Sequence, residues 1–110
     1  MSEQFSDGIC GGWSPVMPVT LEVIKICLEV RHSIEERVEN KTDSKIFIPL
    51  VYSSQTVAGK NYLVKVLLDG KEDGLCVHAK IYQALPCHEG KLSVTGTHFP
   101  KTFYDPLIPF

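Results

Sequence analysis

Long apolar runs and an excess of basic charge are both missing from this chain of 110 residues. No apolar stretch approaches the ~20 residues that a membrane-spanning helix needs. The chain has 11 Lys and Arg against 13 Asp and Glu, a formal net charge of −2. It therefore offers no basic field to attract nucleic acid or an anionic membrane, and neither is expected as a partner.

The first residues, MSEQFSDG, also contain neither a basic nor an apolar segment, so no secretory signal is expected. The four cysteines, Cys10, Cys27, Cys76 and Cys87, could form two disulfides in three connectivities. Without a signal, four free thiols in a reducing compartment are the preferred interpretation. The cytoplasm is accordingly the expected location, and the paired thiols remain the alternative.

The composition is that of a globular protein, with 44% hydrophobic and 22% charged residues. The length suits one domain with a single core. Residues 1–8 show no periodicity and are expected to form a flexible extension. Residues 9–110 are expected to form the domain.

One amphipathic helix is predicted over residues 20–39. Thr20 is a good N-cap, and Glu22 places an acid in the first turn, where the helix dipole favours it. Apolar residues then recur at helical spacing and would form one buried stripe. These residues are Val23, Ile26, Cys27, Val30, Ile34 and Val38.

The remainder of the chain alternates apolar and polar residues with a period of two, which predicts strands. Pro49 removes a backbone donor and indicates an edge or a bulge. One helix followed by strands joined by short turns predicts an α+β fold, an antiparallel meander packed across the helix. The expected strands cover residues 45–55, 61–68, 75–85 and 91–98.

Alternate turns of a meander lie at the same end of its sheet. The turns at residues 55–59 and 85–90 should therefore be neighbours, with the turn at 69–74 at the opposite end. Val57 and Leu85-Pro86 are apolar although turn tips are usually polar. We expect Gly59 to supply the left-handed conformation that closes the first turn. Apolar side chains on a narrow exposed edge favour insertion into a cleft on a partner.

Three other kinds of site are weaker. A zinc site and a catalytic cysteine–histidine pair both lack the spacing of known motifs. Aromatic side chains that could stack on bases have few basic neighbours. We therefore expect no metal, no cofactor and no enzyme activity. The residues considered were Cys76, His78, Cys87 and His88 for zinc, and Tyr62 and Tyr82 for bases.

Several segments resemble the cystatins, inhibitors of papain-like cysteine proteases. Gln55-Thr-Val-Ala-Gly59 matches their Gln-x-Val-x-Gly signature. The rest is similar to the stefins, the intracellular type 1 branch, over about residues 9–110. The further matching segments are Gly11-Gly12, Thr20 through Ile34-Glu-Glu36, His78-x-Lys80-x-Tyr82, Leu85-Pro86 and Asp105-x-Leu107-x-x-Phe110.

The resemblance implies a cystatin-like fold, a twisted antiparallel sheet of four to five strands wrapped around one long α-helix, with a short extra strand from the N-terminal arm. It also implies a reversible tight-binding inhibitor of papain-like, cathepsin-type proteases. An arm and two hairpin tips would enter the active-site cleft as a wedge. Its residues would be Ile9, Cys10, Gly11, Gly12, Gln55, Thr56, Val57, Ala58, Gly59, Leu85, Pro86, Cys87 and His88.

Two alternatives accompany this interpretation. Because a fold does not fix a function, the chain could be a non-inhibitory protein-binding module on the same fold. A monomer is expected, but stefins can exchange a domain by straightening the first hairpin. The β-favouring pair Thr56-Val57 would tolerate such a domain-swapped dimer.

Overall fold

The computed structural model describes residues 12–38 and 46–110 of the chain. Helices and strands follow one another in the order of the sequence. The elements are β2 (Met17–Pro18), α1 (Leu21–Glu29), α2 (Arg31–Val38), β3 (Ile48–Val57), β4 (Gly59–Asp69), β5 (Leu75–Gln83), a short 3₁₀ helix η2 (Pro86–His88) and β6 (Leu92–Thr102).

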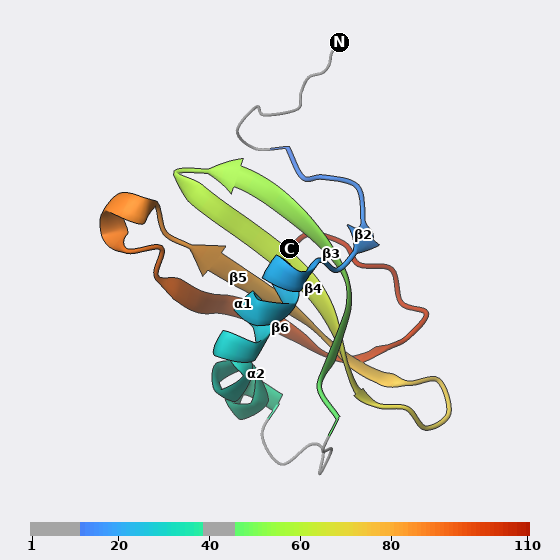
Figure 1. Cartoon of the computed structure of the whole chain (residues 1–110). Coiled ribbons are helices and arrows are strands. Elements are labelled where there is room, and N and C mark those ends of the chain that lie inside the picture. The colour runs from blue at the N-terminus through green and yellow to red at the C-terminus, as the bar shows by residue number, and fades with distance from the viewer. Residues whose placement is uncertain (1–11, 39–45) are drawn as a thin grey trace.

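The strands form one antiparallel sheet in the order β2-β3-β4-β5-β6. Figure 1 shows this sheet twisting around the helices. The predicted α+β meander is confirmed. So is the short extra strand from the arm, which the resemblance implied and the residue pattern alone did not predict.

The predicted helix over residues 20–39 is instead two helices, because Val30 leaves helical geometry at φ −106° and ψ 13°. The Val30 amide still donates to the Ile26 carbonyl, and the Ile34 amide to the Val30 carbonyl. The axis therefore bends rather than ends. Val30 is itself buried, and the bend keeps the stripes of both helices against a twisted sheet, which a straight rod would leave. Thr20 is the N-cap, as expected, and its Oγ1 accepts from the Val23 amide.

The main core lies between the helices and the inner face of the sheet. All six residues of the predicted stripe are buried there. They meet alternate residues of β4 and β5, which agrees with the period of two that predicted these strands. The strand residues are Tyr62, Val64, Val66, Leu68, Val77, Ala79 and Ile81.

Two strands of the sheet, β3 and β6, each accommodate a proline. The register of β3 against β4 shifts between Pro49 and Val51, which is the bulge that Pro49 indicated. The last strand was expected to end at residue 98, but β6 continues through Pro100 to Thr102. A proline is tolerated there because β6 is the outermost strand in the order of the sheet.

Candidate functional site

The first tip is the β3–β4 hairpin, in which Ala58 alone separates the two strands. Val57 pairs directly with Gly59, and Gly59 has φ +108°, the positive angle that was expected of it. A Cβ on Gly59 would lie 2.5 Å from the backbone oxygen of Gln83. Both the dihedral angle and the space therefore require glycine at this position.

A neighbouring strand holds the first tip in place. The hydroxyl of Tyr82, on β5, donates a hydrogen bond to the carbonyl oxygen of Ala58. Below the tip, Nδ2 of the Asn61 side chain donates to Oε1 of Gln55 across the hairpin at 2.9 Å. The sequence analysis gave neither Tyr82 nor Asn61 a role at this tip, and it considered Tyr82 only for stacking on bases. The signal for Tyr82 was its position on the strand that pairs with the hairpin.

The arm runs antiparallel beside the first tip. Trp13 forms an isolated bridge with Gln55, and the Ser14 amide donates to the Ser54 carbonyl at 2.8 Å. The side chains add to this pairing, since Ser53 Oγ donates to the Ser14 carbonyl at 2.6 Å. Hydrogen bonds thus tie the arm to β3 immediately before the tip.

The second tip spans residues 85–90 and is built around η2. The His88 amide donates to the Leu85 carbonyl and the Glu89 amide to the Pro86 carbonyl, both at 2.8 Å. Glu89 and Gly90 then turn the chain back with positive φ. Leu85, Pro86, Cys87 and His88 are all exposed, so the tip presents its side chains outward.

The two tips lie side by side, as the meander predicted. A hollow of about 270 Å³ separates their bases, and residues of both hairpins line it, among them Gly59, Lys60, Leu85 and Pro86. In Figure 1 both tips lie at one end of the sheet, and the turn between β4 and β5 lies at the other.

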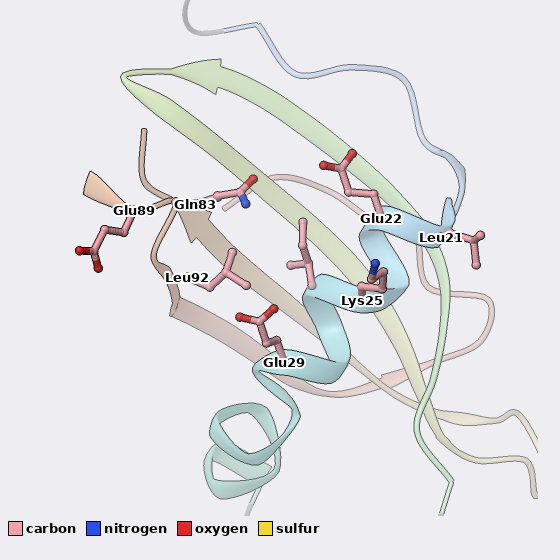
Figure 2. Close-up of a pocket in the computed structure, with 9 residues that line it drawn as sticks. Leu21, Glu22, Lys25, Glu29, Gln83, Glu89 and Leu92 are labelled. Atoms are coloured by element: carbon pink, nitrogen blue, oxygen red, sulfur yellow. The ribbon is translucent and has the colours of Figure 1, made fainter. Parts of the chain in front are cut away.

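A second, larger hollow of about 600 Å³ lies between α1 and the second tip (Figure 2). Leu92 and Ile26 contribute apolar surface, and Glu22, Glu29 and Glu89 contribute carboxylates. The carboxylates lie apart around the rim and do not converge on one point (Figure 2). The hollow therefore gives the second tip a negatively charged flank without forming a cation site.

The predicted wedge residues fall into two groups. Ile9, Cys10 and Gly11 lie outside the described residues, whereas Gly12 is exposed at the start of the arm. The predicted residues of both tips come together at one end of the sheet. At the first tip Thr56 and Ala58 are exposed, while Val57 is half-buried. Trp13 and Ser14, which the sequence did not single out, connect the arm to this edge.

The residues considered for other chemistry are spread apart. Cys27 is buried in the helix stripe, and its burial raises the pKa of the thiol to about 12. Cys76 and His78 lie in the first half of β5, away from Cys87 on the second tip. The three thiols in the described segments, those of Cys27, Cys76 and Cys87, are free. Those segments contain no group of three metal-ligating side chains.

Within residues 12–38 and 46–110, α1 and α2 fall short of the length and hydropathy that crossing a bilayer requires.

Relatives of known name agree with the fold described above, although no family model matches the chain. Cystatin-B of Bos taurus is 40% identical over 103 residues, which cover 93% of this chain and 99% of that protein. Cystatin-A of Felis catus is 37% identical over 102 residues, with coverage of 93% and 99%. Leukocyte cysteine proteinase inhibitor 1 of Sus scrofa is 37% identical over 102 residues, with coverage of 93% and 94%. At this identity over nearly the whole length, the chain belongs to the stefin type of the cystatin family.

Proposed function

We propose that this chain is a reversible tight-binding inhibitor of papain-like cysteine proteases and not an enzyme. The observation that carries the proposal is the edge formed by the arm and the two tips. Its exposed residues include Gly12, Ala58 and Leu85, which are small or apolar although they lie far from the core. The names of the relatives, cystatin and cysteine proteinase inhibitor, support the same function.

The mechanism that we propose is occlusion of the protease cleft by a preformed edge. The first tip enters already shaped, because Gly59 and Tyr82 fix the carbonyl of Ala58 before any partner binds. Such preorganisation lowers the entropy lost on binding, and the affinity depends on this loss as well as on the buried interface area. The second tip adds Leu85 and Pro86 beside it, and the arm adds Gly12 and, on the proposal, Ile9 to Gly11.

The direct test is to titrate papain with the protein and follow hydrolysis of a small fluorogenic substrate. Loss of activity with a stoichiometric end point at nanomolar enzyme, reversed on dilution, is the expected result. Trypsin serves as the control, since its activity should stay unchanged. Complex formation detected by calorimetry with full papain activity would instead establish the alternative, a non-inhibitory binding module.

A monomer in the cytoplasm remains the predicted state. Straightening the hairpin at Ala58 would convert β3 and β4 into one long strand that two copies exchange. The hydrogen bond from Tyr82 to Ala58 opposes that change. Light scattering after mild heating distinguishes the monomer from the exchanged dimer. If it detects monomer and no dimer, domain exchange is contradicted.

A further inference from the structure

The sheet has a second, smaller apolar layer on the face that points away from the helices. Residues 63, 65 and 67 of β4 and 76, 78 and 80 of β5 alternate with the inner core residues, so they occupy this outer face. Leu63 and Cys76 are 0% exposed there, and Leu107 from the end of the chain is 8% exposed. The segment over residues 103–110, the C-terminal strap, therefore covers the outer face.

Lysines hold the strap at both of its ends. Nζ of Lys65 donates to the backbone oxygens of Phe103 at 2.8 Å and Asp105 at 2.6 Å. Nζ of Lys80 donates to the backbone oxygen of Phe110 at 2.6 Å. Such bonds from a charged donor are stronger than neutral ones.

The last residue of the strap also rests on β6. The ring of Phe110 stacks on His98 with a centroid separation of 3.6 Å. Gly96 leaves room for that ring, because a Cβ there would approach it to 3.2 Å. Contacts on three strands, β4, β5 and β6, thus fasten the strap.

His78 lies beneath this cover, in the middle of the outer face. Its cross-strand neighbours are Lys65 on β4 and His98 on β6. The side chain is 1% exposed, and its Nε2 atom has no hydrogen-bond partner among the described residues. Such a nitrogen is tolerable in a neutral imidazole, but a protonated ring would carry a buried charge without a partner.

The charges that face His78 come from each packed element. Lys65 from β4 and Lys101 and His98 from β6 disfavour its protonation, while Asp105 from the strap favours it. The Asp105 carboxylate already accepts a hydrogen bond from the Thr102 amide at 2.7 Å. Burial first, and then the two lysines, lower the pKa of His78 to about 4.

We propose that the C-terminal strap is an acid-released cover: protonation of His78 lifts residues 103–110 off β4 and β5 and exposes the apolar outer face. The imidazolium needs water, and the strap is bonded to Lys65 and Lys80, which share the outer face with His78. The lysines on either side repel the new charge, which adds to the driving force. The strap opens as a unit because its bonds to Lys65 and Lys80 share one segment.

The direction in which pH changes the stability of the closed strap follows from the pKa of His78 in the closed and open forms. His78 has a lower pKa when the strap is closed than the ordinary value of 6.5 expected when it is open to water. The open form thus binds more protons between about pH 6.5 and pH 4, and the closed form loses stability as the pH falls through that window. Above pH 6.5 the strap is unaffected. Between pH 7 and pH 5 the open fraction should rise on the order of 20-fold.

Hydrogen–deuterium exchange of the full-length protein between pH 7.5 and pH 4.5 tests the proposal, with rates corrected for intrinsic exchange. The protection of amides in residues 103–110 should fall about 20-fold between pH 7 and pH 5, while the helices α1 and α2 keep theirs. In His78→Gln the protection should not change with pH. His32→Gln is the matched control, because His32 is exposed on α2, and it should behave as the parent does.

Two further outcomes bear on the proposal. If His98→Gln abolishes the pH dependence and His78→Gln retains it, the titrating group is His98 and the proposal is wrong. Constant protection of the strap in the parent from pH 7.5 to 4.5 also overturns it. Should His78→Gln fail to fold, His78→Phe fills the same apolar space and gives the same test. These readouts are independent of protease inhibition, so they stand whether or not the proposed function holds.

Discussion

The two hairpin tips reach the same edge by different means. A neighbouring strand shapes the first tip, through the Tyr82 hydroxyl and the close packing of Gly59 against Gln83. Hydrogen bonds within the loop itself shape the second tip, around Pro86. The difference indicates that the first tip is rigid and intolerant of change, whereas the second depends on local sequence and exposes most of its side chains.

Gly59→Ala should have the largest effect, because it disrupts the close packing that makes the first tip rigid. The new Cβ would meet a backbone oxygen at 2.5 Å, and the residue would keep a positive φ. We expect a loss on the order of 3 kcal/mol in the free energy of unfolding, with weaker inhibition of papain. Urea denaturation measures the first effect. Gly70→Ala is the matched control, since its Cβ would contact nothing within 4 Å, and a similar loss there would refute the packing argument.

Val57→Asp should have the second-largest effect. It tests whether the first tip contacts the protease, and it leaves the packing that makes the tip rigid unchanged. A carboxylate at this position would be desolvated against the cleft wall, at a cost on the order of several kcal/mol in binding. The inhibition constant should rise at least about 100-fold while the unfolding midpoint stays close to that of the parent. Leu28→Asp, at an exposed apolar position on α1, should inhibit as the parent does. Equal inhibition by the Val57 variant would mean that the first tip does not enter the cleft.

Tyr82→Phe should have a smaller effect, since it removes one hydrogen bond between β5 and the first tip. We expect a loss of about 1 kcal/mol in stability and faster exchange of the amides around Ala58. The hydroxyl of Tyr52 makes no hydrogen bond within residues 12–38 and 46–110, so Tyr52→Phe is the matched control. Identical behaviour of the two variants would show that the neighbouring strand does not hold the tip.

Cys87→Ser should have the smallest effect, because Cys87 is exposed and the second tip keeps its backbone bonds without it. A change within about 0.5 kcal/mol in stability is expected, with the inhibition constant nearly unchanged under reducing conditions. Thermal unfolding and papain titration measure both quantities. A large loss of stability would mean that the second tip is as constrained as the first.

Local patterns predicted much of this molecule. The spacing from Val23 to Val38 predicted which helix residues are buried, and alternation along β4 and β5 predicted strands there. Pro49 predicted a bulge, and Gly59 predicted a positive φ. These predictions succeed because each depends on residues that are near one another in the chain.

Other features were not predictable in this way. The bend at Val30 depends on the curvature of a sheet that is formed much later in the sequence. The hydrogen bond between Tyr82 and Ala58 depends on the register between β5 and the hairpin. The length of β6 depends on its pairing with β5 and not on its own composition.

The sequence by itself determined the class of fold, the two apolar tips and their placement at one end of the meander. It could do so because hydrophobic periodicity and turn chemistry act locally. Only the tertiary structure decided that His78 and Lys65 are buried, since an alternating strand pattern assigns both to a face that water would normally reach. The strap over residues 103–110 has no periodicity of its own, and the cover it gives exists only when the sheet beneath it has formed.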